Sequence, residues 1–460
     1  ITKNSLYNKW SYKSTNNKFY SNITLRFLNE RRVGGEFNFM PNKHKGDTIV
    51  YGQVVEFDQP EIYQKTSYKI NANHSILLES AYSYHQQTSF FGSKKYSGNQ
   101  QLHYENMSHI LSWGQHKFSY GSSFKQIKIK ENITKTTSLQ ENMQNEKITG
   151  LFLENHFKWK KNAEFIAGVR VEKYNELRRP FIIPRALLKY NFSKNTTFRA
   201  SAGKGWRTVN LFSENMSLLG CNREIIISDN LEPEEAYNFG VNLLHTIYRE
   251  NSEFQIIIDF YKTIFSNQIF PDYYGHFTNE SVDDIYDSSN IYLYNFQERS
   301  VSNSFQAEIG MEFLKSIGIK VAYNYLHVFR EWEGERHQLP FNSKHHILGT
   351  FSYQPINKDW QFDLNTHVFG PKKLVYNENN EINHTSETYS DTYTILNAQF
   401  TKKLKQIEIY CGAENILNFK QTNPIINPEA PFDADFDSSN GVWGPINGIE
   451  MYIGIRVKVE

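Results

Sequence analysis

Few side chains in this 460-residue sequence are arranged for covalent chemistry. The sequence contains no nucleophile-elbow pattern G-x-S-x-G, no metalloprotease pattern H-E-x-x-H, no phosphate-binding loop and no glycine-rich dinucleotide fingerprint. Each of these patterns sets a nucleophile, a base or a phosphate-binding backbone at a fixed spacing, so the sequence favours binding over catalysis. We expect no enzyme activity and no bound cofactor.

Histidines are the strongest candidates for metal chemistry. His345 and His346 open a predicted strand, and His337 lies in the loop before it. Three neutral imidazoles could bind copper or zinc. The alternative is three exposed polar side chains, and the six methionines and two cysteines of the chain add no soft-ligand cluster. We keep the three histidines as candidates and predict no metal site from them.

Two acidic runs could supply carboxylates to a calcium ion. DADFDSSN (433–440) and DDIYDSSN (283–290) each carry several aspartates, but they lack the glycine and closing glutamate of an EF-hand loop. Solvated loops are therefore the simpler interpretation. The two cysteines, Cys221 and Cys411, lie too far apart in sequence for a metal-binding spacing.

The segment GKGWRTVNLFSENMSLLGCNREI (203–225) mixes charged and apolar residues in a way that neither a solvated loop nor a core helix requires. Its polar residues could face a ligand, or they could hydrogen-bond locally and shape the loop. Its apolar residues are interpreted as the internal packing of that loop. The candidates for ligand binding or loop shaping are Arg207, Asn210, Glu214, Asn215 and Arg223.

The elements that position these residues are strands, because the dominant hydrophobic period is two. In AEFIAGVRVE (163–172), Phe165, Val169 and Val171 share one face while Arg170 and Glu172 share the other. The stretches KVAYNYL (320–326), WQFDLNTHVF (360–369) and YIGIRVKVE (452–460) alternate in the same way. About 19 such runs of roughly 10–14 residues are predicted, which is the length that a tilted membrane strand requires.

Composition supports a transmembrane barrel over a soluble fold. Aromatic residues make up 15% of the chain and charged residues 22%, as expected for an apolar outer band with aromatic girdles around a wet interior. The sequence contains no run of 18 apolar residues, so no transmembrane helix is predicted. The net charge is +1 and no basic patch is visible, so no nucleic-acid partner is expected.

The predicted connections alternate between long and short, as in an up-and-down barrel with long loops on one side of a membrane. The long connections are 88–98, 130–146, 175–180, 206–233, 267–290, 332–343, 371–390 and 418–446, and the short ones are 112–116, 160–162, 192–195, 249–252, 315–318, 355–358 and 404–406. Upstream, 49–57 and 61–70 are predicted to form a hairpin joined by a tight FDQPE turn.

Strand number sharpens the fold class. Single-chain bacterial barrels have even numbers of strands, so KWSYKS (9–14) is interpreted as a further strand, or further strands lie outside this chain. We predict an all-β, antiparallel, up-and-down transmembrane barrel over 1–460 as one domain, with about 19–20 strands visible of about 22.

Four stretches resemble TonB-dependent outer-membrane receptors. ASAGKGWRTVNLFSEN (200–215) is similar to the family pattern G-x-G-[FW]-R-x-x-N-[LI], and LEPEEAYNFGVNL (231–243) is similar to the segment that follows it. GAENILNFKQ (412–421) and the closing strand YIGIRVKVE complete the ordered set, while RRVGGEFNF (31–39) resembles receptors of Bacteroidetes-like bacteria. The motif residues with an implied structural role are Gly203, Gly205, Trp206, Leu231, Pro233, Glu234, Asn238, Gly240, Asn415 and Asn418.

The resemblance implies a receptor in the bacterial outer membrane that captures a scarce ligand in its extracellular loops. Its implied partners are the TonB energising complex, outer-membrane lipid, a small transported ligand (a siderophore, cobalamin, metal complex, glycan or peptide) and a surface lipoprotein. The plug, the TonB box and the first strands are expected to lie outside this chain. The alternatives are a passive channel or porin and a surface adhesion barrel.

Overall fold

The computed structural model describes residues 1–135, 139–228, 231–273, 290–332, 334–375 and 388–458. These residues divide into two compact units. The first unit contains 1–187, 210–222 and 429–436, and the second contains 188–209, 223–428 and 437–460. The single-domain assignment of the sequence stays a prediction, and each unit is described by itself.

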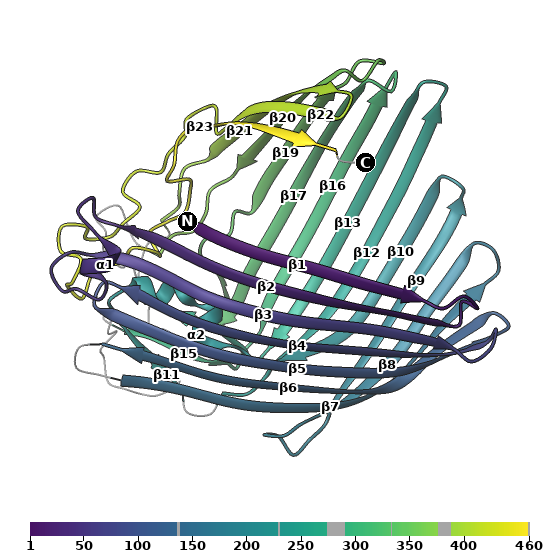
Figure 1. Ribbon diagram of the computed structural model, residues 1–460, viewed down its shortest axis with the longest axis horizontal. Coiled ribbons are helices and arrows are strands. Elements are labelled where there is room, and N and C mark those ends of the chain that lie inside the picture. Colours follow the sequence, from purple (N-terminus) through teal and green to yellow (C-terminus); the bar gives the residue numbers. More distant parts are fainter. Residues whose placement is uncertain (136–138, 229–230, 274–289, 333, 376–387, 459–460) are drawn as a thin grey trace. The chain divides into compact units, whose positions relative to one another are not determined.

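The first unit is an antiparallel meander in which each strand pairs with the next along the chain. Figure 1 shows these strands side by side in sequence order. They are β1 (Thr2–Lys13), β2 (Phe19–Gly35), β3 (Gly52–Lys69), β4 (His74–Phe91), β5 (Lys94–Trp113), β6 (His116–Thr134), β7 (Leu139–Trp159) and β8 (Ala163–Tyr174).

The second unit is a meander of the same kind, and β9 (Phe181–Ser193) runs from the first unit into it. Its further long strands are β10 (Thr196–Arg207), β12 (Glu234–Arg249), β13 (Ser252–Ser266), β16 (Ser300–Phe313), β17 (Ile317–Trp332), β19 (His345–Tyr353), β20 (Trp360–Phe369), β21 (Tyr393–Leu404), β22 (Ile407–Glu414) and β23 (Glu450–Val457). From β10 onward, each pairs antiparallel with the next in this order. The short β18 (Glu335–Gln338) folds back on the end of β17.

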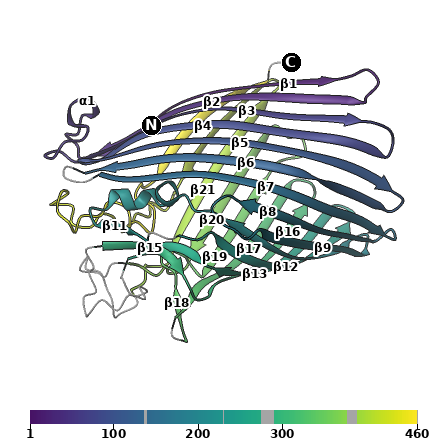
Figure 2. The ribbon, with the colours of Figure 1, turned by 90° about the horizontal axis from the view of Figure 1, so that it is seen from below.

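A small three-stranded sheet is built from the long connections of the second unit. β11 (Glu224–Ile227) lies parallel to β15 (Asn290–Phe296), and β14 (Gln268–Asp272) lies antiparallel to β15. Figure 2 shows β11 beside β15. Phe270 and Phe296 are buried together in this sheet, so these loops have a core of their own.

Helix is confined to short pieces of the described residues. They are α1 (Pro41–His44), α2 (Leu211–Glu214) and the 3₁₀ turn η1 (Met216–Gly220). None of the helices in the described part of the chain has the length and apolarity needed to cross a membrane.

The long strands of the second unit carry an apolar face and a polar face. Ile309 on β16 pairs with Val321 on β17, and each side chain is 51% exposed. The neighbouring residues Glu308 and Lys320 form an ion pair at 2.8 Å on the other face. A band of exposed aliphatic side chains suits lipid, and the alternating ions suit water, so the predicted alternation is confirmed.

The first unit shows the same alternation, but the two faces exchange character part-way along β6. Tyr120 and Phe124 lie on the same face as Lys128 and Lys130, because all four positions are even. On the other face, Ile129 near the end of the strand is buried. The apolar face thus becomes polar, and the polar face becomes apolar, where the strand extends beyond the hydrocarbon layer.

Most short connections fall where the sequence places them. The turns at 114–115, 160–162, 194–195, 250–251 and 405–406 join consecutive long strands. Nineteen strands of eight residues or more are present in the described residues, within the predicted 19–20. They include β1, into which KWSYKS largely falls, and they count as one strand, β3, the two runs predicted at 49–57 and 61–70.

Three predictions for the first unit are wrong. Residues 52–69 form one strand, β3, so the predicted hairpin with a tight FDQPE turn does not exist. The predicted long loop at 88–98 is mostly strand, with β4 and β5 separated only by Gly92 and Ser93. Much of the predicted loop at 130–146 belongs to β6 and β7. In each case polar residues on strands that extend past the apolar band resemble loop residues in sequence.

Lysine substitutions at two adjacent positions of β16 test the assignment of the faces. Ile309→Lys places a charge on the apolar face and is expected to cost about 2–4 kcal/mol of barrel stability near the middle of a membrane. Gly310→Lys is the matched control, because a side chain there meets open space on the polar face beside Glu312. Unfolding in lipid vesicles measures the loss of stability caused by each substitution. Equal losses for Ile309→Lys and Gly310→Lys would contradict the assignment of the faces.

Single cysteines test the sidedness. In a Cys411→Ser background, Glu335→Cys in the β17–β18 hairpin should react with a membrane-impermeant maleimide on intact cells. Glu250→Cys in the short β12–β13 turn should react only after the cells are opened. Both positions are exposed, so access alone decides the outcome. The reverse pattern would invert the topology.

Candidate functional site

The end of β10 is held by ion pairs with the start of β12. Arg207 lies opposite Glu234 in the strand pairing, and its Nε donates to Glu234 Oε2 at 2.7 Å. The buried Glu234 also accepts the backbone N–H of Ile269 at 2.7 Å through Oε1. Lys204 and Glu235 form a second ion pair. Arg207 and Glu234 therefore fix the base of the loop that follows β10, which supports the loop-shaping alternative for Arg207.

The next candidates bond to one another within one turn. The side chain of Glu214 accepts the backbone N–H of Asn210 at 3.0 Å, and the N–H of Glu214 donates to the Asn210 carbonyl at 3.0 Å. The side-chain amide of Asn215 donates to the Leu211 carbonyl at 2.7 Å. These contacts satisfy the free backbone groups of a helix too short to do so itself. They too support loop shaping.

The apolar residues of this loop form a buried cluster, as interpreted from the sequence. Leu211, Phe212, Leu218 and Leu219 are each 3% exposed or less. The apolar residues at the end of β6, Ile129 and Ile133, are also buried. The loop and this end of β6 therefore both contribute apolar side chains to the interior of the first unit.

Polar contacts tie the 210–222 loop to the strands of the first unit. Lys94 Nζ donates to the Cys221 carbonyl, and Lys135 Nζ donates to the Asn222 carbonyl at 3.4 Å. Asn222 Nδ2 in turn donates to the carbonyls of Pro431 at 3.0 Å and Asp433 at 2.9 Å. Segments more than 200 residues apart in sequence are thereby joined.

Glu131 is the most deeply buried acid in these contacts, at 1% exposure. Its carboxylate accepts the Tyr96 hydroxyl at 2.9 Å, the Asn142 side-chain amide at 2.8 Å and the backbone N–H of Ser213. Three donors offset the cost of burying the charge, and one of them belongs to the loop. The carboxylate therefore links β5, β6 and β7 to the 210–222 loop.

Arg223 lies inside the small loop sheet of the second unit. Its side chain is 4% exposed, and its Nη2 donates to the carbonyls of Tyr273 at 2.6 Å and Asn290 at 2.5 Å. Tyr294 on β15 donates to Asp272 on β14 at 3.2 Å, and burial is the main cause that raises the pKa of Tyr294, so the phenol stays protonated. A buried arginine of this kind organises the loops rather than meeting a ligand from solution.

The family-motif residues have backbone roles that explain their types. Asn415 and Asn418 adopt positive φ angles of 50° and 53°, a region that asparagine tolerates. The Asn415 side chain donates to the carbonyls of Phe419 at 2.7 Å and Asn447 at 3.1 Å. At Gly240 a Cβ atom would lie 2.3 Å from the Tyr261 ring, so a larger residue would displace that ring.

Other motif positions lie in strands or strand approaches of the second unit. Asn238 donates to the Thr263 hydroxyl at 2.7 Å. Gly203 and Gly205 sit opposite Asn238 and Ala236 in the β10–β12 pairing. Trp206 lies opposite Glu235, Pro233 is buried, and Leu231 is half-buried just before them.

The candidate histidines do not form one cluster. His345 and His346 are adjacent on β19, so their side chains lie on opposite faces. His345 shares a hydrogen bond of 2.8 Å with Tyr323, while His337 lies on β18. No group of three or more potential metal ligands of the His, Cys, Asp or Glu type occurs among the described residues. The acidic run at 433–440 is held by local hydrogen bonds to the buried Asp437, whereas 283–289 lie outside the described residues.

A row of rings on the polar face of the second unit was missed from the sequence. His346 stacks on Phe369 at 4.4 Å, Phe369 on Tyr393 at 4.9 Å, and Tyr393 on Phe419 at 4.8 Å between ring centroids. Lys372 donates to the Tyr393 hydroxyl at 3.1 Å. Strand pairing aligns His346, Phe369 and Tyr393, and the connection after β22 adds Phe419, so no local pattern could have shown the row. Because the rings cover one another's faces and Tyr393 is buried, the half-buried edges of His346 and Phe369 are what the row offers to a ligand.

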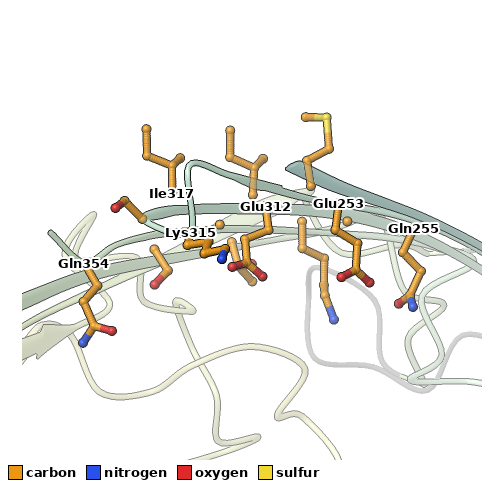
Figure 3. Close-up of a pocket in the computed structure, with 14 residues that line it drawn as sticks. Glu253, Gln255, Glu312, Lys315, Ile317 and Gln354 are labelled. Carbon is orange, nitrogen blue, oxygen red and sulfur yellow. The ribbon is translucent and has the colours of Figure 1, made fainter. Parts of the chain in front are cut away.

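A cavity of about 420 Å³ lies on the polar face at the short-turn end of the second unit. Figure 3 shows Glu253, Gln255, Glu312 and Gln354 pointing to one side, while Ile317 points away. Glu253 and Glu312 are directly opposite in the β13–β16 pairing. Like charges placed opposite each other repel, so a cationic group would be stabilised between them.

The sequence matches the family model "TonB dependent receptor-like, beta-barrel" over residues 1–416. The chain belongs to this family. A TonB-dependent receptor barrel lies in the outer membrane of Gram-negative bacteria, and the apolar faces of both units agree with that location. No curated protein sequence matches the chain.

Solved structures of TonB-dependent receptors share this fold. The outer-membrane transporter YddB from Escherichia coli has a TM-score of 0.68 at 10% identity, over 99% of this chain and 69% of its own. The FrpB iron transporter from Neisseria meningitidis has a TM-score of 0.67 at 10% identity, and the match covers 99% of this chain and 71% of FrpB. FpvA of P. aeruginosa, bound to an iron–pyoverdine complex, has a TM-score of 0.71 at 11% identity, and the match covers 99% of this chain and 64% of FpvA. At these identities the likeness concerns the fold.

Substitution of Glu131 tests the attachment of the 210–222 loop. Glu131→Ala leaves three donors without their acceptor, which is expected to weaken the closed loop by about 1–3 kcal/mol. Protease cleavage within 210–222 should then become faster while the barrel stays folded. Lys130→Ala, on the opposite face of the same strand, is the control. Unchanged cleavage in Glu131→Ala would show that the carboxylate does not hold the loop.

Proposed function

We propose that this barrel belongs to an active importer that captures a scarce ligand on its extracellular side and moves it inward with TonB-coupled energy. The observation that carries the proposal is the asymmetry of the connections. Turns of two to six residues join the strands on one side, whereas folded, hydrogen-bonded loops with their own buried residues occupy the other. A passive pore would not require ordered loops of this kind.

The loops and the ring row supply a surface of mixed chemistry for a ligand. The half-buried His346 and Phe369 present ring edges, and Lys372 contributes a cation beside Phe369 and Tyr393. Such a surface can bind a planar or chelated ligand through contacts with the ring edges and through the charge of the lysine. FrpB is described as an iron transporter, and OprC, another solved structure of this fold (TM-score 0.65 at 10% identity), is described as a copper transporter. Metal chelates are therefore the first cargo class to test. The TonB complex and a surface lipoprotein are its proposed partners.

Energy dependence separates the importer from a passive channel. Cells with the full-length protein should accumulate more iron from ferric citrate, or more copper from copper chloride, than deletion cells under metal limitation. A protonophore should abolish that difference, since TonB draws on the proton gradient. Uptake that persists after collapse of the gradient would favour the channel, and no difference for any small probe would favour an adhesion barrel.

A further inference from the structure

We infer that the outer face of β4, β5 and β6 carries a binding site for the phosphate-bearing headgroup of an outer-leaflet lipid. The site is independent of what the barrel transports. It is a hollow of about 300 Å³, at the lower end of the range for ligand pockets. The lining residues are Tyr82, Gln101, His103, Gln126 and Lys128.

The position of the hollow along the strands identifies its partner as a lipid. The same face of β4, β5 and β7 is apolar farther down, where Leu78, Met107 and Leu151 are exposed. Phe124 is the last aromatic residue on this face of β6, and it lies edge-on to His103 at 6.0 Å between centroids. His103 and Gln126 lie one row beyond Phe124, and Gln101 and Lys128 lie two rows beyond it. A group bound here sits where acyl chains end and headgroups begin.

The chemistry of the lining suits an anion that accepts hydrogen bonds. Lys128 offers an ammonium group, Gln101 and Gln126 offer side-chain amides, and Tyr82 offers a phenol at the end of an apolar ring. Phosphate oxygens only accept, so every one of these donors can serve. Tyr82 is 44% exposed, as expected for an aromatic side chain at a membrane boundary.

Charge on this face favours the same partner. Lys128, Lys130 and Lys147 are exposed, and the described residues give none of their ammonium groups an ion-pair partner. Three unpaired lysines on one membrane-proximal face repel one another unless an anion neutralises them.

One carboxylate adjoins the hollow. Glu105 accepts the Ser80 hydroxyl at 2.5 Å and lies 3.1 Å from the Nε2 atom of His103. It thus already has two partners, and it lies one row toward the apolar band. Glu141 on β7 is exposed on the same face farther out, opposite Asn132. The three lysines on β6 and β7 outnumber these two carboxylates, so the lysine-bearing face favours an anion.

The test compares two pairs of lysines on the same strand. The full-length protein is purified in detergent and mixed with lipid A or with dephosphorylated lipid A, and bound lipid is counted by native mass spectrometry. Wild-type protein should prefer the phosphorylated form. Lys128→Gln with Lys130→Gln should weaken its binding about thirtyfold, at about fivefold per lysine. Arginine at both positions should preserve it.

The control removes the same charge from the other face. Lys117→Gln with Lys125→Gln changes two odd-numbered positions of β6 and should leave lipid binding unchanged. Equal losses in the two glutamine pairs, or equal retention of dephosphorylated lipid, would overturn the inference. Inorganic phosphate is the remaining arm: binding as tight as that of lipid A would assign the hollow to free anions instead.

Discussion

The structure depends on one constraint: inside a lipid layer, each backbone N–H and C=O must find its partner within the protein. The meanders of both units meet it by pairing each long strand with its sequence neighbour. Hydrogen bonding thereby fixes the backbone and leaves the side chains free to differ between the two faces. The ion pair of Glu308 and Lys320 can therefore lie one residue away from exposed aliphatic side chains.

The same strands behave differently where they leave the hydrocarbon layer. Water on the outer side allows Lys128 and Lys130 to occupy positions that are aromatic lower on β6. Folded loops on the other side bury Ile129 and enclose Glu131 with its donors. The exchange of faces thus permits a receptor to carry structured loops without a separate domain. It also places cationic side chains at the level of lipid headgroups.

The candidate site illustrates the difference between a motif and a binding surface. Arg207, Asn210, Glu214, Asn215 and Arg223 were singled out as the polar residues of one unusual segment. Their contacts are to backbone carbonyls, to neighbouring N–H groups and to a buried carboxylate. Residues of this kind shape loops whatever the cargo is. Two rings of the row, His346 and Phe369, come instead from β19 and β20, which carry none of these motifs.

The sequence by itself determined the period of two, the strand lengths, most of the short turns and the family. Each of these depends on residues that are close together in the sequence. It could not separate a long strand from a loop at 88–98 or 130–146, since a strand in water is polar on its outer side, like a loop. Only the tertiary structure decided that Asn222 meets Pro431, that Glu131 reaches Ser213 and that His346 stacks on Phe369. These contacts join residues remote in sequence, and strand register and loop packing set them.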